Sequence, residues 1–194
     1  MPITHTNRKG VTYTLCQGTT KTGKPRYYFT PNPGDNALDA IPDGWEISES
    51  INAVVSLVRR RPQQIEDAEV AGVRAALDRH PQGKRYRVEV RDKEIVVYAR
   101  QEPDLDDILQ IIDPGVRLSE EHARDLKESM TARAHYEPVM RFTLVDPESR
   151  RFTAARMGYT TSRDGWQEIH RTGSIGKLAR QLIPTLDTDE FFQL

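Results

Sequence analysis

The stretch Tyr86-Arg-Val-Glu-Val-Arg-Asp-Lys-Glu-Ile-Val-Val-Tyr98 decides the fold class, because it predicts a β-hairpin. Tyr86, Val88 and Val90 alternate with charged residues, which places apolar side chains on one face of a strand and charges on the other. Asp92-Lys93 has the chemistry of a tight turn, and residues 95–98 continue as a second strand. Antiparallel sheet is therefore the expected core of this part of the chain.

Amphipathic helices flank this hairpin on both sides. The apolar residues at helical spacing are Val70, Val73 and Leu77 before it, and Leu105, Ile108, Leu109 and Ile112 after it. Pro81 with Gly83 ends the first helix, and Asp113-Pro-Gly115 ends the second. The middle of the chain is thus predicted to run helix, hairpin, helix.

The first sixty residues predict a small antiparallel sheet of four strands. Its strands are expected at residues 11–15, 26–30, 45–49 and 53–58, with Gly23 in the first turn. Residues 32–44 contain two prolines and two glycines, so they are expected to form a loop. Cys16 lies on the first hairpin and is expected to be a small buried apolar side chain.

The last third of the chain predicts a helix capped by Ser119, a β-meander over residues 138–170 and a C-terminal helix. The first of these helices has a narrow apolar stripe around Leu126 and Met130. Strands and helices come in blocks without strict alternation, which favours an α+β fold. We therefore expect small antiparallel sheets with flanking helices, in two or three units. The expected units are residues 1-61 (antiparallel β), 62-115 (helix-hairpin-helix) and 116-194 (helix, β-meander, C-terminal helix).

Composition restricts the function classes. The 194 residues carry 28 lysines and arginines against 29 aspartates and glutamates, for a net charge of −1. This balance argues against bulk affinity for nucleic acid or acidic membranes, both of which need a sustained positive field. The single cysteine excludes an intramolecular disulfide, and no run approaches the about 20 apolar residues of a membrane span. Residues 1–10 lack the apolar run of a signal peptide, so a cytoplasmic protein without a membrane partner is expected.

No motif identifies a catalytic, cofactor or metal site. Gly173-Ser-Ile-Gly-Lys177 is too short for a phosphate-binding loop and predicts a serine-capped helix instead. An acidic run could hold a divalent cation, but acids also stabilise the start of a helix. Its members are Glu102, Asp104, Asp106, Asp107 and Asp113. We expect no cofactor and no metal, and the catalytic residues, if any, are unknown.

The N-terminal hairpin is the strongest candidate for a contact surface. Residues 1–30 contain five basic residues and no acid, interleaved with aromatic residues, and Arg59-Arg-Arg61 could extend the same edge. Cations can contact phosphates while aromatic rings stack on exposed bases. Aromatic residues also favour strands for packing alone, and lysines protect sheet edges from pairing, so both interpretations stay open. The candidate binding residues are Lys21, Lys24, Arg26, Tyr28, Arg59 and Arg60.

Several segments resemble a group of uncharacterised bacterial proteins. The first is Thr20-Lys-Thr-Gly-Lys-Pro-Arg-Tyr-Tyr-Phe29, followed by Ala40-Ile-Pro-Asp-Gly-Trp-Glu-Ile47 and Asn52-Ala-Val-Val-Ser-Leu-Val-Arg59. The C-terminal segments Leu178-Ala-Arg-Gln-Leu-Ile183 and Asp189-Glu-Phe-Phe192 are similar as well. The resemblance implies a bacterial, cytoplasmic origin and brings no catalytic residues with it.

Two functions from different classes follow. The leading hypothesis is a non-enzymatic binding protein that uses the basic-aromatic hairpin to contact a nucleic acid or an acidic protein partner. The alternative is a hydrolase, nuclease-like, whose site is assembled from residues distant in the sequence. A homo-oligomer that pairs through strand edges or through the stripe at Leu126 and Met130 is also left open.

Overall fold

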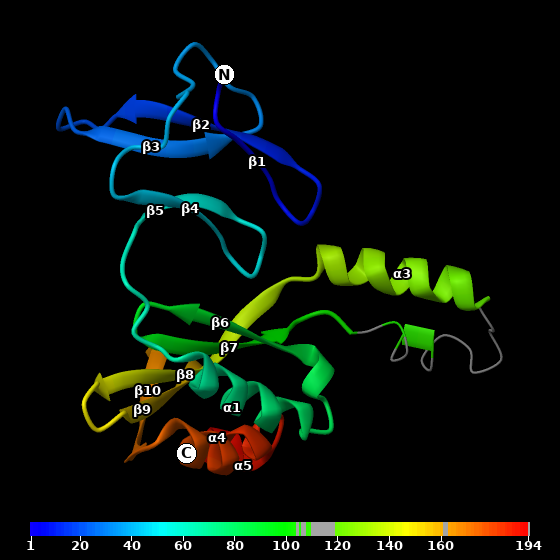
Figure 1. The fold of residues 1–194 in the computed structure, drawn as a ribbon. Helices are drawn as coiled ribbons and strands as arrows, with labels where there is room; N and C mark the ends of the chain where they lie inside the picture. Colours follow the sequence, from blue (N-terminus) through cyan, green and yellow to red (C-terminus); the bar gives the residue numbers. More distant parts are fainter. Residues whose placement is uncertain (104, 106–107, 110–118, 161–162, 194) are drawn as a thin grey trace. The chain divides into compact units, whose positions relative to one another are not determined.

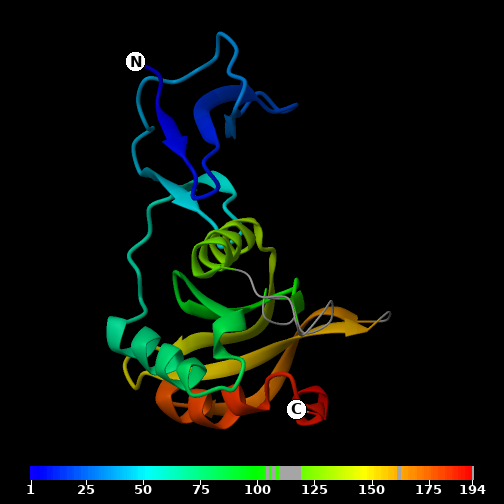
Figure 2. The ribbon, with the colours of Figure 1, turned by 90° about the vertical axis from the view of Figure 1, so that its right-hand side faces the viewer.

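The computed structural model describes residues 1–103, 105, 108–109, 119–160 and 163–193 (Figures 1 and 2). It divides into two compact units, the first made of residues 1–61 and 102–135 and the second of residues 62–101 and 136–194. The described residues form antiparallel sheets of three, two and five strands, accompanied by helices. The predicted α+β class, with small antiparallel sheets in several units, is confirmed.

The first unit contains two small sheets. The three-stranded sheet has the order β1-β2-β3 and consists of β1 (Thr4–Thr6), β2 (Thr12–Thr19) and β3 (Pro25–Thr30). The second sheet pairs β4 (Trp45–Glu49) with β5 (Val55–Arg59). The sequence predicted four strands in one sheet, and the structure differs by the additional strand β1 and by the separation into two sheets. β1 has only three residues, which is too short for periodicity to reveal it.

Side chains between the two sheets hold the first unit together. The rings of Tyr27 and Trp45 meet edge to face with centroids 5.5 Å apart. His5 Nε2 lies 3.0 Å from a carboxylate oxygen of Glu49, and the Asn7 amide donates to a backbone carbonyl of the β4–β5 turn at 2.8 Å. Cys16 is fully buried, as predicted.

Glu49 makes the stability of the first unit dependent on pH in the acidic range. Burial by itself raises the pKa of Glu49, but the hydrogen bond with His5, the Arg8 backbone N–H and the Arg8 charge together lower it below its ordinary value of 4.5. A depressed carboxylate pKa contributes stability above the unfolded-state pKa, and this contribution disappears as the pH falls through the folded-state pKa. We therefore expect the stability advantage of the wild type over Glu49→Gln to shrink below about pH 4.5, the usual range of a glutamate.

Urea unfolding at pH 7 and pH 4, followed by Trp45 fluorescence in a Trp166→Phe background, measures this effect. Glu46→Gln is the matched control on the same strand, because the Glu46 carboxylate lies 3.7 Å from Arg60 and is more exposed than that of Glu49. An equal loss of stability in wild type and Glu49→Gln on acidification would contradict the prediction.

The helix α3 (Glu120–Arg133) also belongs to the first unit. Its N-terminus is capped as predicted, with the Ser119 hydroxyl accepting a hydrogen bond from the His122 backbone N–H at 3.3 Å. None of its residues is buried, and Leu126 is 42% exposed. Most of the helix expected over residues 105–112 lies outside the described residues, as do Asp104, Asp106, Asp107 and Asp113 of the acidic run.

The second unit is a five-stranded antiparallel meander with helices. Its sheet has the order β10-β9-β8-β7-β6. The strands are β6 (Tyr86–Arg91), β7 (Glu94–Arg100), β8 (Tyr136–Asp146), β9 (Arg151–Thr160) and β10 (Arg163–Gly173). The helices are α1 (Asp67–Asp78), η1 (Gly83–Arg85), α4 (Ile175–Leu182), η2 (Ile183–Thr185) and α5 (Asp189–Gln193).

The pairing of β7 with β8 changes the expected division of the chain. The sequence predicts these strands in separate units, 62-115 and 116-194, but they are hydrogen-bonded neighbours in one sheet. Residues 102–135 fall in the first compact unit, so each unit is made of two separate segments of the chain. The boundary after Arg61 coincides with the first expected boundary.

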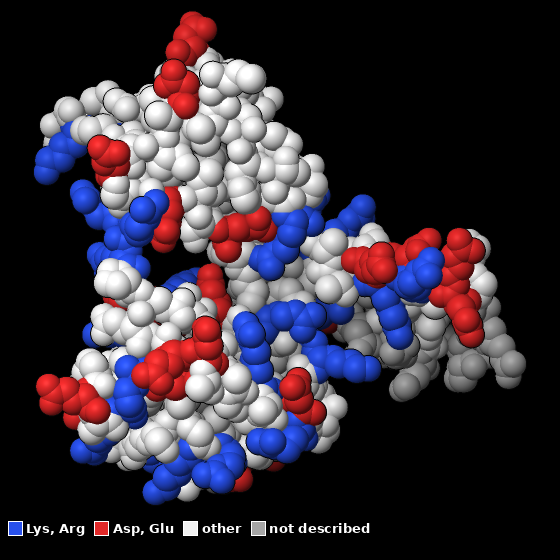
Figure 3. Space-filling view, viewed as in Figure 1, with Lys and Arg blue, Asp and Glu red and all other residues white. Residues whose placement is uncertain are grey.

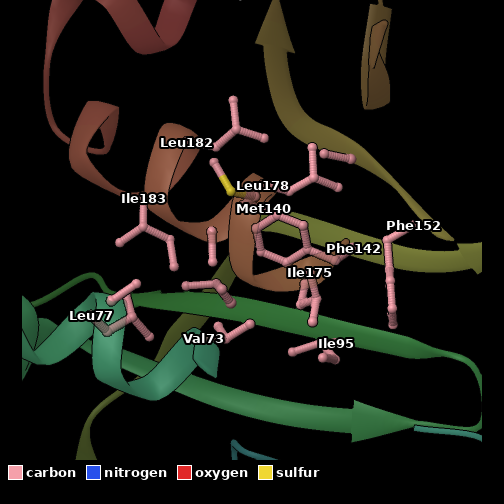
Figure 4. Packing of buried hydrophobic residues seen from close by; sticks show 14 of the residues in the cluster. Val73, Leu77, Ile95, Met140, Phe142, Phe152, Ile175, Leu178, Leu182 and Ile183 are labelled. Carbon is pink, nitrogen blue, oxygen red and sulfur yellow. The ribbon is translucent and has the colours of Figure 1, made fainter. Parts of the chain in front are cut away.

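One face of the five-stranded sheet is covered by α1, α4 and α5 (Figures 1 and 2). The core lies between these helices and the sheet, and Figure 4 shows side chains from both layers pointing into it. Phe142 and Phe152 from the sheet and Leu178 and Leu182 from α4 are at most 1% exposed. The opposite face carries no helix among the described residues of this unit, yet Val96 and Tyr98 on it are only 2% and 5% exposed.

The start of α1 is tied to the turn between β8 and β9 by an ion pair. Glu69 is 7% exposed, and its carboxylate accepts two hydrogen bonds from the Arg150 guanidinium, one of them at 2.9 Å. The same carboxylate accepts the Glu66 backbone N–H, which completes a capping box at the helix start. Glu69 is thus a buried charge with its partners in place, and the contact is structural.

Candidate nucleic-acid interface

The turn between β2 and β3 holds two lysines at an exposed position. Gly23 adopts a φ of +80°, and the Thr20 backbone N–H donates to the Lys24 carbonyl at 2.8 Å. The Thr20 hydroxyl also accepts the Lys24 backbone N–H at 3.1 Å. The turn is therefore well defined, and it presents Lys21 and Lys24 to solvent. In Figure 3 lysine or arginine side chains project at the outer end of this hairpin.

Arg26 and Tyr28 lie on one face of β3, since residues two apart on a strand share a face. The residue paired with Arg26 on β2 is Gly18, and a Cβ atom on Gly18 would be 3.4 Å from the Tyr28 ring. The ring thus lies against a position without a side chain. The Tyr28 hydroxyl accepts a hydrogen bond from the Asn36 amide at 2.7 Å, yet the residue is 36% exposed. Tyr28 is an aromatic surface that is held in place before any ligand arrives.

The other aromatic residues of the hairpin have a packing role. Tyr27 and Phe29 alternate with Tyr28, so they point to the opposite face, where Tyr27 contacts Trp45 of the second sheet. Only one of the aromatic residues that the sequence placed among the cations therefore accompanies them on the surface. The alternation of side chains along β3 distinguishes exposed Tyr28 from Tyr27 and Phe29, because successive residues of a strand point to opposite faces.

Arg59 and Arg60 do not join the hairpin cations. The Arg59 guanidinium lies over the Trp45 ring, 5.0 Å from its centroid, on the side of the hairpin away from Tyr28. Arg60 faces Glu46, with 3.7 Å between Nε and the carboxylate. The structure brings together four of the six candidate residues, Lys21, Lys24, Arg26 and Tyr28, which we call the hairpin surface.

The cations of the hairpin surface are unpaired within the part of the chain that the structure describes. No carboxylate there lies within 4.0 Å of Lys21, Lys24 or Arg26, whereas Arg8 at the base of the same sheet pairs with Glu49 at 3.2 Å. All three side chains are exposed. The hairpin surface therefore has a local positive charge although the whole chain is nearly neutral.

A second set of arginines and aromatic residues lies on the face of the five-stranded sheet opposite to α1 and α4. Arginine guanidinium groups are placed over aromatic rings at 4.6–5.9 Å in three pairs. The pairs are Arg87 with Tyr136, Arg91 with Tyr98, and Arg141 with Trp166. Sequence inspection missed this arrangement, because its members come from four strands. The alternation of Arg87, Glu89 and Arg91 was the only local signal.

Two of these three arginines are neutralised by carboxylates. Arg91 donates to Glu89 at 2.7 Å and to the Tyr98 hydroxyl at 2.7 Å, and burial together with the Glu89 hydrogen bond raises the pKa of Tyr98 to about 12. Arg141 lies 3.5 Å from Glu94 and 3.6 Å from Glu168. These ion pairs leave little net charge at Arg91 and Arg141, although the buried Nε of Arg141 has no hydrogen-bond partner among the described residues.

Side chains that could bind a metal ion do not gather among the described residues. No group of three or more His, Cys, Asp or Glu side chains among them could hold a metal ion. Ser174 precedes α4 as predicted, although its side chain makes no capping hydrogen bond, and Lys177 is exposed. Two open depressions of about 560 and 480 Å³ lie beside β10 with α5 and beside α1, respectively. None of the described helices is long and apolar enough to span a membrane.

Comparisons of the chain with models of protein families, with curated proteins and with solved structures find no match.

Proposed function

We propose that this protein is a non-enzymatic binding protein that contacts single-stranded nucleic acid through the hairpin surface. The observation that carries the proposal is three exposed, unpaired cations next to an exposed, fixed tyrosine ring on one hairpin. Lysine and arginine side chains neutralise backbone phosphates, and an aromatic ring can stack on a base without reading its sequence.

The single aromatic ring favours single strands over duplexes. Bases in a duplex are stacked on one another, so a tyrosine can stack only on a base that is unpaired and turned outward. The hairpin is also small and has no helix to enter a major groove. Its cations would contact a few phosphates, which supports moderate affinity with a marked dependence on salt.

Fluorescence anisotropy with labelled single-stranded DNA, single-stranded RNA and duplex DNA, each at low and physiological salt, tests the proposal. We expect single strands to bind best. In the triple variant Lys21→Glu, Lys24→Glu, Arg26→Glu, affinity should fall by at least tenfold. The slope of log affinity against log salt should decrease in magnitude by about 2, because each single-strand phosphate contact contributes roughly 0.7.

A triple variant of equal charge change controls for the overall electrostatic effect. Arg74→Glu, Arg171→Glu, Lys177→Glu reverses three exposed cations of the second unit and should bind as the wild type does apart from a small general loss. Equal losses in both triple variants, or no binding of the wild type at low salt, would refute the proposal. Stronger binding of labelled polyglutamate than of nucleic acid would point to an acidic protein partner instead.

A further inference from the structure

The strand β6 ends the five-stranded sheet and has one free edge. Among the described residues of the second unit, it pairs with β7 alone. The Tyr86 N–H donates to the Gly83 carbonyl, and the Tyr86 carbonyl accepts a hydrogen bond from the Arg87 guanidinium at 3.0 Å, so neither group belongs to the ladder with β7. Because these directions alternate along a strand, the backbone groups of Val88 and Val90 also face the free edge. β6 thus offers N–H and C=O groups to a further strand.

Apolar side chains beside this edge are incompletely covered. Val88 and Val90 are only partly buried, although both pack against the hydrophobic core under the helices. A depression of about 480 Å³ lies between α1 and β6 on this side of the sheet. Its apolar lining consists of Val70, Ala71, Ala75 and Val90. A strand added to β6 would cover the two valines and extend the sheet below the depression.

The other face of β6 carries charges of alternating sign. The Arg87 guanidinium is exposed, and no carboxylate of the described residues lies within 4.0 Å of it. Two residues further on, the Glu89 carboxylate is held by Arg91 at 2.7 Å. In an antiparallel pair of β6 strands related by a two-fold axis at Val88, Arg87 of each copy lies opposite the partner's Glu89. The pairing therefore creates two symmetry-related ion pairs.

This register satisfies the backbone as well as the charges. Val88, whose N–H and C=O face the free edge, meets its own copy in a hydrogen-bonded pair, and Tyr86 meets the partner's Val90 in the same way. Arg87 and Glu89 then fall in the non-hydrogen-bonded pairs, where side chains of adjacent strands come closest.

The neighbouring registers are unfavourable. An axis at Arg87 or at Glu89 would place like charges directly opposite each other. An axis at Val90 would require the Asp92 carbonyl, which already accepts the Gln64 N–H at 3.1 Å. β6 is therefore self-complementary in the register centred on Val88, and self-complementarity is what a symmetric dimer requires.

We propose that β6 pairs with β6 of a second copy of this chain, so that two copies form a symmetric dimer with one continuous antiparallel sheet. The two-fold axis is perpendicular to the sheet, which places the α1 helices of both copies on the same face, one on each side of the join. Main-chain hydrogen bonds supply affinity in such strand additions, and the side chains select the partner. All the groups involved belong to the second unit, so the inference is independent of the proposed nucleic-acid contact.

Sedimentation velocity of the full chain over a range of concentrations tests the dimer. We expect the wild type to approach twice the mass of one chain as its concentration rises. Arg87→Glu should raise the dissociation constant by about tenfold or more, because both symmetry-related pairs then bring two carboxylates together. Glu89→Arg should have the same effect with two guanidinium groups. An equimolar mixture of the two variants should regain the dimer, since each copy then meets the opposite charge.

A backbone variant and hydrogen exchange test the same register independently. Val88→Pro removes an N–H at the free edge and leaves the hydrogen bonds with β7 in place, so it should weaken the dimer while circular dichroism stays that of the wild type. In the wild type, the amide protons of Val88 and Val90 should exchange more slowly as the protein concentration rises.

Arg171→Glu is the matched control, because Arg171 is exposed on β10 at the opposite edge of the same sheet. Its mass should equal that of the wild type at every concentration. Recovery of the dimer in the mixture separates a charge contact from a loss of folding, since a misfolded variant is not rescued by another. A wild type that remains monomeric at the highest soluble concentration, or a mixture that fails to regain the dimer, would overturn the inference. Loss of the dimer in Arg171→Glu alone would place the contact at β10 and overturn it as well.

Discussion

Replacing Phe142 by alanine is expected to lower the free energy of unfolding of the second unit by about 3–5 kcal/mol. Phe142 lies on β8, the central strand of the five-stranded sheet, and its side chain is 0% exposed. Its strand neighbours are Ile95 and Ala154, and Figure 4 shows its ring beside Leu178 of α4. Alanine would leave a cavity between sheet and helices that neighbouring side chains on two rigid layers cannot fill.

Urea unfolding followed by circular dichroism measures this loss. Val145→Ala is the matched control, since Val145 belongs to the same strand but is 54% exposed. Its truncation should change stability by no more than about 0.5 kcal/mol, as is usual for surface positions. A loss below about 1 kcal/mol in Phe142→Ala would mean that the helices α1 and α4 do not pack on the sheet as described.

Gly83→Ala is expected to destabilise the same unit by about 2–3 kcal/mol, the upper range for a forced steric overlap. A Cβ atom on Gly83 would lie 2.1 Å from the backbone carbonyl oxygen of Leu77, at the end of α1. Neither group can rotate away, because both belong to the backbone. The Gly83 N–H donates to the His80 carbonyl at 2.9 Å, which holds η1 against the end of the helix.

Gly72→Ala is the matched control and should have the opposite effect. Gly72 lies in the middle of α1, and a Cβ atom there would have no atom within 4 Å other than those of its chain neighbours and the helix's own backbone. Alanine should stabilise the helix by roughly 0.5–1 kcal/mol, since it loses less conformational freedom on folding than glycine does. Thermal melts of both variants measure the expected loss of stability in Gly83→Ala and the expected gain in Gly72→Ala. If Gly83→Ala were as stable as wild type, the close approach of η1 to α1 would be wrong.

Local patterns in the sequence determined much of the secondary structure. The alternation from Tyr86 to Arg91 predicted β6, and the turn chemistry of Asp92 predicted the hairpin to β7, where Asp92 has a φ of +46°. Apolar residues at helical spacing predicted α1, α3 and α4. These signals act between residues close in the chain, where backbone preferences and the choice of buried face are set by neighbours.

The same local patterns predicted part of the hairpin surface. Gly23 predicted the turn that presents Lys21 and Lys24, and the period of two on β3 separates Tyr28 from Tyr27. Local patterns could not predict the positions of Arg59 and Arg60, because these positions depend on how the second small sheet packs against the first. Sequence proximity to a basic run does not show which ring or carboxylate an arginine will meet.

Only the tertiary structure decided which strands are neighbours. β7 and β8 pair although residues 102–135 separate them, and that pairing joins two expected units into one sheet. The same pairing places Arg100 beside Tyr136. Strand pairing over such a distance is selected by the packing of whole faces and by the entropy of closing the loop, and neither is contained in any local period of the sequence.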